Sequence, residues 1–266
     1  MIDQRGEIMK RTPITMQGNN FPEQLHELLE GAKLFDSSCS PEARVWLVDK
    51  QDGFFIKSSA AGTLQKEAAM TEFFHRKGLG PEVLMYIQQD QDWLVTRRIP
   101  GEDCLSYLEN AKSLCDTTAE LLRQLHDTDP TGCPINRTEN YIATAKENFH
   151  LGQYDRSLFP DNWGYASAEE TFQVVCDAAP ILKQDTLIHG DYCLPNIILK
   201  DGSFSGFIDL GSGGLGDRHI DLFWGVWSLG FNLKTNKWKN RFLDAYGRDR
   251  IQPELLDAIG AFEVFI

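Results

Sequence analysis

The chain has 266 residues, with 26 Lys and Arg against 39 Asp and Glu, so its formal net charge at pH 7 is −13. A hydrophobic fraction of 42% supplies enough apolar side chains for a packed core, which rules out a disordered chain. The acidic balance argues against nucleic acid and anionic membranes as main partners, because both require dense Lys and Arg. It leaves room for a cationic partner, although solubility alone also explains it.

The start of the chain and its cysteines indicate the compartment. Residues 1–7 contain no apolar run, and the nearly apolar stretch 222–233 is shorter than the about 20 residues of a bilayer span. The six cysteines are scattered and form no Cys-x-x-Cys pair, which argues against a zinc site or a redox motif. We therefore expect a cytoplasmic monomer with reduced cysteines.

The first part of the chain is predicted to be rich in strands. A helix is expected over residues 21–32, and a second one over 63–77 that ends at Gly78, because glycine commonly closes a helix. Short β-rich runs bounded by turn residues predict strands at residues 45–48, 54–57, 82–87 and 93–96.

After the Pro-Gly pair at 100–101 the pattern becomes mainly helical, with leucines at helical spacing over 114–126. One β-rich island, residues 186–210, interrupts it. The change predicts an α+β fold of two lobes with a cleft between them: a β-rich N-terminal lobe over 1–98 and a larger helical lobe over 99–266.

The β-rich island contains a predicted hairpin. The Asp-Gly pair at 201–202 lies between two apolar runs, a strong signal for a two-residue turn. Pairing outward from this turn places Lys200 opposite Ser203 and Asn196 opposite Phe207.

Three oxygen-bearing side chains gather at the open end of this hairpin. Asp209 lies just past the end of the second strand, diagonally across the hairpin from Asn196. The amide oxygen of Asn196 and the carboxylate of Asp209 can therefore reach one metal ion. Asp191 approaches the same end from the preceding loop. Two oxygen ligands beside a free carboxylate predict a magnesium-phosphate site with a base next to it.

The spacing of these residues matches a kinase pattern. His-x-Asp, with Asn five residues after the Asp, followed by Asp-x-Gly, is the catalytic-loop and metal-loop pair of kinases. Here these residues are His189, Asp191, Asn196, Asp209 and Gly211. His-Gly-Asp alone would also suit a chance loop in an unrelated α/β protein, but the hairpin and the Asn offset favour a kinase.

A kinase also needs a strand Lys for the α- and β-phosphates and a helix Glu that orients it. Lys57 ends an apolar run, and Glu67 falls inside the apolar arc of the next helix. A carboxylate there is costly unless it is paired, so we predict a Lys57–Glu67 ion pair. Without the downstream motifs, Lys57 would equally suit a surface position at a strand end.

Weaker signals concern the nucleotide and the helix after the hairpin. Ser40, in a serine-rich segment, is expected to cover the phosphates, and the carbonyl of Thr96 and the N–H of Arg98 are expected to bind adenine. Asp217, His219 and Asp221 have liganding side chains but would not converge on a helix. We predict that Asp221 instead accepts backbone hydrogen bonds from the catalytic loop.

Nearly the whole chain resembles the aminoglycoside O-phosphotransferases, especially the kanamycin/neomycin 3'-kinase branch. The run His-Gly-Asp-x-Cys-Leu-Pro-Asn-Ile is specific to this branch and its close relatives. The matching positions are residues 40–45, 93–94, 99–101, 126, 133–134, 189–198, 205–211 and 216–218. The resemblance implies a protein-kinase-like fold, ATP or GTP as donor, Mg²⁺, and phosphorylation of an aminoglycoside hydroxyl, the 3'-hydroxyl in this branch, which gives antibiotic resistance.

The roles of family residues carry over by position. The resemblance implies that Lys57 holds the α- and β-phosphates and that Glu67 orients it. It implies that Asp191 orients or deprotonates the attacking hydroxyl, and that Asn196 and Asp209 bind magnesium.

In the family, acidic residues hold the ammonium groups of the drug. The matching groups here are Asp161, Asp191, Glu263 and the terminal carboxylate of Ile266. The chain ends Phe-Glu-Val-Phe-Ile where the branch has Leu-Asp-Glu and two aromatics, so one of two adjacent acids is missing. Ser212 stands where the family usually has Arg. Both departures affect the expected acceptor rather than the kinase chemistry.

Two alternatives stay open. The first is a kinase of another small hydroxylated amine, sugar or macrolide. The second is a non-catalytic kinase-like binding module, which the complete set of five kinase residues argues against. A protein kinase is disfavoured because no Ala-Pro-Glu segment follows Asp209.

Overall fold

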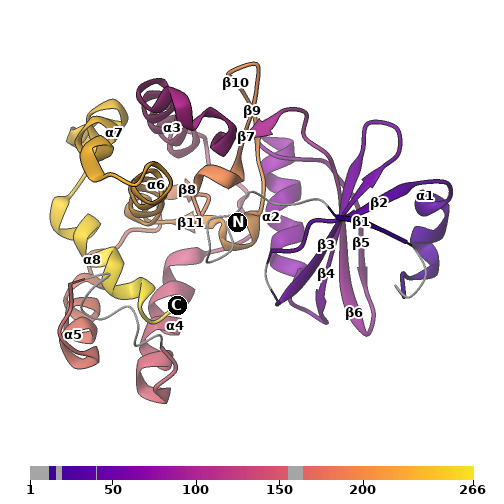
Figure 1. Cartoon of the computed structure of the whole chain (residues 1–266). Coiled ribbons are helices and arrows are strands. Elements are labelled where there is room, and N and C mark those ends of the chain that lie inside the picture. The colour runs from indigo at the N-terminus through magenta and orange to yellow at the C-terminus, as the bar shows by residue number, and fades with distance from the viewer. Residues whose placement is uncertain (1–11, 16–19, 40, 155–163) are drawn as a thin grey trace. The chain divides into compact units, whose positions relative to one another are not determined.

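The computed structural model describes residues 12–15, 20–39, 41–154 and 164–266, and the chain divides into two compact units. The first unit comprises Met1–Cys104 and Pro195–Gly211, and the second comprises Leu105–Leu194 and Ser212–Ile266. Figure 1 shows their elements along the chain. Within the described part of the chain, no helix has the length and apolarity needed to cross a membrane.

A six-stranded antiparallel sheet forms most of the first unit, in the order β1-β2-β3-β4-β6-β5. The four predicted strands are present: β3 (Ala43–Asp49), β4 (Phe54–Ala60) and β6 (Gln91–Arg97) are longer than expected, and β5 (Val83–Gln88) is shifted by one residue. Strands β1 (Thr12–Ile14) and β2 (Lys33–Asp36) were not predicted.

The helices of the first unit pack apolar side chains against this sheet. The predicted helix at 21–32 is shorter in the structure, a 3-10 turn (Glu23–Leu25) followed by α1 (His26–Leu29), and Gly31 then takes a positive φ of 71°. Its Leu25 and Leu29 join a buried cluster with side chains of β3, β4 and β6. Helix α2 (Gln65–Arg76) lies beside the sheet, and the predicted Gly78 follows its C-cap, Lys77, with a positive φ of 72°.

The predicted hairpin is formed by β9 (Ile197–Lys200) and β10 (Ser203–Phe207), with β7 (Glu102–Asp103) on the other side of β9. Lys200 lies opposite Ser203 as predicted, but Phe207 lies opposite Ile197 and not Asn196. The register shifts by one residue because Ser205 forms a β-bulge. Asn196 consequently bonds to Ile208, whose N–H donates to its carbonyl at 3.0 Å.

The second unit is mainly helical, as the periodicity predicts. It contains a 3-10 segment (Cys104–Asn110), whose first residue belongs to the first unit, and a two-stranded sheet of β8 (Thr186–Ile188) and β11 (Gly214–Gly216). Its α-helices are α3 (Ala111–His126), α4 (Arg137–Leu151), α5 (Ala168–Ala178), α6 (Arg218–Leu233), α7 (Lys239–Tyr246) and α8 (Pro253–Glu263).

Two packing regions hold the second unit together. The leucines of α3 that show helical spacing are buried, and α3 packs against α6 and α7. Helix α8 packs against α4, α5 and α6, and the chain end lies beside α4 in Figure 1. All six cysteines are free.

Candidate active site

An ion cluster in the first unit joins three of the predicted site residues. Lys57 on β4 donates from Nζ to Glu67 Oε1 at 2.9 Å and to Glu67 Oε2 at 2.8 Å. The same ammonium donates to Asp209 Oδ1, just beyond β10, at 2.9 Å. The predicted Lys57–Glu67 pair is therefore confirmed, and Asp209 shares the lysine with it.

The cluster is mostly removed from solvent, since the side chains of Lys57, Glu67 and Asp209 are 19%, 11% and 23% exposed. Burial alone would lower the pKa of Lys57, but the carboxylates of Asp209 and Glu67 raise it above its ordinary value. Burial raises the pKa of Glu67, and Lys57 opposes that shift. One ammonium thus bonds to two carboxylates, those of Glu67 and Asp209.

The backbone at the metal-loop motif is unusual. Asp209 adopts a left-handed conformation with φ of 60°, which is uncommon for a residue with a side chain and best tolerated by Asp and Asn. A Cβ at Gly211 would lie 3.3 Å from Glu67 Oε2, so this glycine lets the loop approach the ion cluster closely. Strained backbone of this kind gathers at functional sites, where surrounding contacts maintain it.

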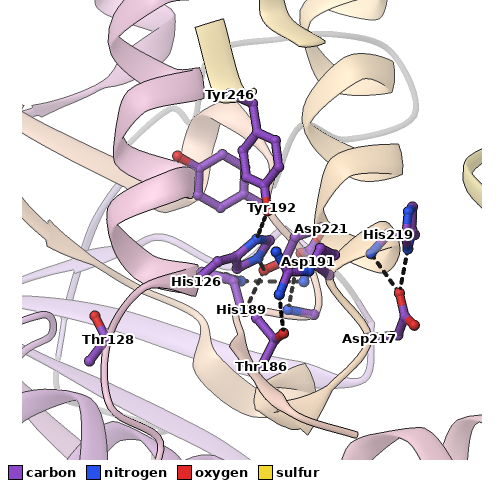
Figure 2. Close-up of polar contacts among 12 residues, drawn as sticks. His126, Thr128, Thr186, His189, Asp191, Tyr192, Asp217, His219, Asp221 and Tyr246 are labelled. Atoms are coloured by element: carbon purple, nitrogen blue, oxygen red, sulfur yellow. Dashed lines mark hydrogen bonds and ion pairs between the residues drawn. The ribbon is translucent and has the colours of Figure 1, made fainter. Parts of the chain in front are cut away.

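The catalytic loop, which contains Asp191, belongs to the second unit. The fully buried carboxylate of Asp221 accepts the N–H of His189 at 2.7 Å and the N–H of Gly190 at 2.7 Å. The prediction for Asp221 is thus confirmed. His126 Nε2 donates to this carboxylate at 3.1 Å, and the other ring nitrogen bonds to Tyr246. Figure 2 shows Tyr246 and the Asp221 carboxylate on different sides of the His126 ring.

The buried His126 extends this network from α3. Burial lowers the pKa of His126, so the ring is neutral at neutral pH: Nε2–H donates to Asp221 and Nδ1 accepts from the Tyr246 hydroxyl at 2.8 Å. Burial also raises the pKa of Tyr246 to about 12, which keeps its proton on the donor. His126 occurs in the sequence resemblance, but its partners are 95 and 120 residues away along the chain.

Gly190 is required between His189 and Asp191. Its φ is 80°, and a Cβ at this position would lie 1.9 Å from the Ser212 carbonyl oxygen. No residue with a side chain fits this contact without moving the backbone. The backbone conformation that only Gly190 allows therefore determines the position of Asp191, the next residue.

Replacing Asp221 with alanine is expected to unfold the catalytic loop. The N–H groups of His189, Gly190 and His126 would be left buried without acceptors, at a cost of about 1–3 kcal/mol each. We expect the free energy of unfolding to fall by at least about 3 kcal/mol, measured by urea denaturation. A loss below about 0.5 kcal/mol, the effect expected at the exposed Asp177, would contradict this role.

Glu263, at the end of α8, bonds to side chains of two other helices of the second unit. The hydroxyl of Tyr141 on α4 donates to Glu263 Oε1 at 2.6 Å, and the side chain of Trp224 on α6 also bonds to it. Burial raises the pKa of Glu263 to about 7, with Asp191 adding to the shift and Tyr141 and Arg137 opposing it. Ile266, another member of the predicted acceptor site, is 46% exposed.

Other predicted residues have different outcomes. Ser40 and Asp161 lie outside the described residues. Thr96 lies on β6, between β4 and β5, opposite Phe55 and Val83. The N–H of Arg98, expected to bind adenine, instead donates to the Gly53 carbonyl at 3.1 Å, because Gly53 has no Cβ and Arg98 packs against it.

A comparison with protein families finds a matching family model. The phosphotransferase enzyme family, APH, matches residues 33–256. The chain is 46% identical over 249 residues to a protein of Lactococcus lactis subsp. lactis named probable aminoglycoside 3'-phosphotransferase, covering 92% of this chain and 95% of that protein. It is 28% identical over 245 residues to an aminoglycoside 3'-phosphotransferase of Niallia circulans, covering 88% and 93%.

Solved structures share the fold. The crystal structure of aminoglycoside-3'-phosphotransferase of type VIII aligns with a TM-score of 0.70 and 22% identity, over 91% of this chain and 97% of that chain. The aminoglycoside phosphotransferase APH(3'')-Id from Streptomyces rimosus, in complex with ADP and streptomycin, aligns with a TM-score of 0.65 and 22% identity, over 83% and 90%.

Proposed function

Because the chain belongs to the phosphotransferase enzyme family, we propose that it transfers the γ-phosphoryl group of a nucleoside triphosphate to a hydroxyl of an aminoglycoside. The observation that carries the proposal is the ion cluster of Lys57, Glu67 and Asp209, which supplies the phosphate-binding lysine with its orienting carboxylate. The relatives' names support the acceptor class, and their prefix supports the 3'-hydroxyl.

The donor side follows from the first unit. Lys57, kept charged by its two carboxylates, holds the α- and β-phosphates, and Glu67 fixes the direction of its ammonium. The Thr96 carbonyl is the group proposed for adenine, and Ser40 for the phosphates. Either ATP or GTP is proposed as the phosphoryl donor.

Magnesium fits the residues at the open end of the hairpin. Asn196 and Asp209 supply an amide oxygen and a carboxylate, the hard donors that Mg²⁺ prefers. When bound, the ion neutralises the charge that develops on the phosphoryl oxygens. The protein holds these ligands ready through the Asn196–Ile208 backbone bond and the lysine contact to Asp209.

The acceptor side follows from the second unit. Asp191 accepts a hydrogen bond from the attacking hydroxyl and takes its proton as the acceptor oxygen bonds to the γ-phosphorus. The bond from that phosphorus to the oxygen bridging the β- and γ-phosphates breaks, and the nucleoside diphosphate leaves. Asp221 and Gly190 position Asp191 for this task.

Charge supports a polycationic acceptor. Asp191, Glu263, Asp161 and the carboxylate of Ile266 are proposed to bind ammonium groups, and the net charge of −13 favours approach of a cation. We further propose that the enzyme works as a cytoplasmic monomer with lobes over 1–98 and 99–266, and that modification of the drug gives resistance.

Turnover against a panel of acceptors tests this function. With ATP or GTP and Mg²⁺, we expect kanamycin and neomycin to stimulate nucleoside diphosphate release, measured in a coupled assay. Removal of magnesium by a chelator should abolish the stimulated rate. Stimulation only by a macrolide, a simple sugar or a choline-like amine would overturn the acceptor while leaving a kinase, and no stimulation by any alcohol would overturn the kinase.

A further inference from the structure

The carboxylate of Glu263 is held by hydrogen bonds within the protein. Its Oε1 accepts from the Tyr141 hydroxyl at 2.6 Å, a short distance typical of a bond to a charged acceptor, and Trp224 contributes a second side-chain bond. The two donors come from different helices, α4 and α6. The carboxylate is therefore fixed in direction by groups that no step of the reaction uses.

Tyr141 itself has little freedom to move. It is fully buried, its ring stacks on Phe262 at 5.1 Å and 20°, and the Arg137 guanidinium lies 5.5 Å over its ring. Phe262 directly precedes Glu263 in the chain. The same side chain thus packs against the end of α8 and bonds to the carboxylate there.

A second bond from α4 holds the residues after Glu263. Asn148 Nδ2 donates to the Phe265 carbonyl at 2.8 Å. Phe149 and Phe172 contact the Phe265 ring with centroids 5.6 and 6.1 Å away. Helix α4 thus donates two hydrogen bonds to the end of the chain, and the Tyr141 bond is the one that reaches a charged group.

From these contacts we propose that Tyr141 is a positioning residue for acceptor binding, whose hydroxyl holds the Glu263 carboxylate in place for an ammonium group of the aminoglycoside. The inference rests on the proposed function, because it needs Glu263 to face the acceptor. Tyr141 has no contact with the reacting hydroxyl in this role and acts only through Glu263.

The charged groups around Glu263 give the proposal a pH dependence. Arg137 and Tyr141 on α4 and Trp224 on α6 favour the ionised carboxylate, whereas burial and Asp191 disfavour it, and its pKa is raised to about 7. The ionised, ammonium-binding form is therefore lost as pH falls through about 7. Losing the Tyr141 donor removes a stabilising contact to the ionised form, so the pKa would rise further.

The Tyr141→Phe variant tests the proposal, because it removes the hydroxyl and keeps the stacked ring. We expect the KM for kanamycin at pH 7 to rise about tenfold, the value of one hydrogen bond to a charged group, while kcat and the nucleotide KM stay within about twofold. The midpoint of the KM-against-pH curve should move to higher pH. The drug's amines titrate identically in both enzymes, so the difference reports on the protein.

Two further variants isolate the effect. Tyr165→Phe removes a tyrosine hydroxyl that bonds to another residue of α8, the Asp257 carbonyl at 3.2 Å, and should leave KM and its pH profile unchanged. Glu263→Gln should raise the KM and flatten its pH dependence between pH 6 and 8. Because Glu263→Gln keeps the size of the side chain, it also tests the role of the carboxylate if Tyr141→Phe fails to fold.

The outcomes separate this inference from the proposed function. If wild-type enzyme shows no aminoglycoside-stimulated turnover, the proposed function fails and the inference fails with it. If wild type turns over but Tyr141→Phe keeps both its KM and its pH midpoint, or Glu263→Gln keeps the wild-type pH dependence, only the inference is overturned.

Discussion

Asp191→Asn is expected to lower kcat by about a thousandfold, because the amide cannot take the proton of the attacking hydroxyl. The substitution preserves the shape of the side chain, and the loop around it is held through backbone groups that bond to Asp221. We therefore expect nucleotide affinity, measured by isothermal titration calorimetry, to stay within about threefold and the thermal midpoint to stay unchanged.

A matched control distinguishes a catalytic loss from a general one. Asp177→Asn makes the same chemical change on an exposed position of α5 and should retain wild-type kcat. If Asp191→Asn kept more than about a tenth of wild-type turnover, the role of general base would have to be given up.

Lys57→Met is expected to damage both stability and activity. The substitution leaves the carboxylates of Glu67 and Asp209 without their shared ammonium in a mostly buried cluster. Removing one partner of a buried ion pair typically costs about 3–5 kcal/mol, and partial exposure here favours the lower end. We expect the free energy of unfolding to fall by about 3 kcal/mol in urea denaturation, and the nucleotide KM to rise at least about tenfold.

A double variant separates these two effects. Glu67→Gln removes one of the uncompensated charges, so Lys57→Met/Glu67→Gln should recover most of the lost stability. Activity should not recover, because no ammonium is left for the phosphates. Recovery of the nucleotide KM in the double variant would show that Lys57 acts only as a structural ion-pair partner.

The Lys57–Glu67 pair could be predicted from the sequence because each half leaves a local signal. Lys57 ends a β-rich run, and Glu67 interrupts the apolar face of a helix, where an unpaired carboxylate is too costly to keep. The role of Asp221 could also be predicted. Because Asp217, His219 and Asp221 would not converge on a metal ion, a structural role for the Asp221 carboxylate was favoured. At both positions an unpaired carboxylate would carry a large free-energy cost.

The register of the β9–β10 hairpin and the hydrogen bond of the Arg98 N–H could not be predicted from the sequence pattern. The bulge at Ser205 is associated with tertiary contacts: its hydroxyl donates to the Pro100 carbonyl, and the next residue, Gly206, has Ile99 where a Cβ would lie. Likewise, any residue type could offer the N–H that Arg98 donates to Gly53. Simple outward pairing was therefore wrong at Asn196, and the sequence did not indicate the bond between Arg98 and Gly53.

Tyr141 illustrates a third kind of residue. Its place on the buried face of α4 is what helical periodicity would assign to an ordinary core side chain. Only the fold reveals that its hydroxyl meets Glu263, a partner 122 residues away in the chain. A buried tyrosine must find a hydrogen-bond partner, but the sequence does not indicate which one.

Identification of the reaction product tests the phosphotransferase assignment most directly. Full-length enzyme is incubated with ATP, Mg²⁺ and kanamycin, and the drug is analysed by mass spectrometry and ³¹P NMR. We expect one phosphate per drug molecule, attached at the 3'-hydroxyl, and no phosphorylated drug from Asp191→Asn over the same time. Unmodified kanamycin in the wild-type reaction, with ATP intact, would contradict the assignment.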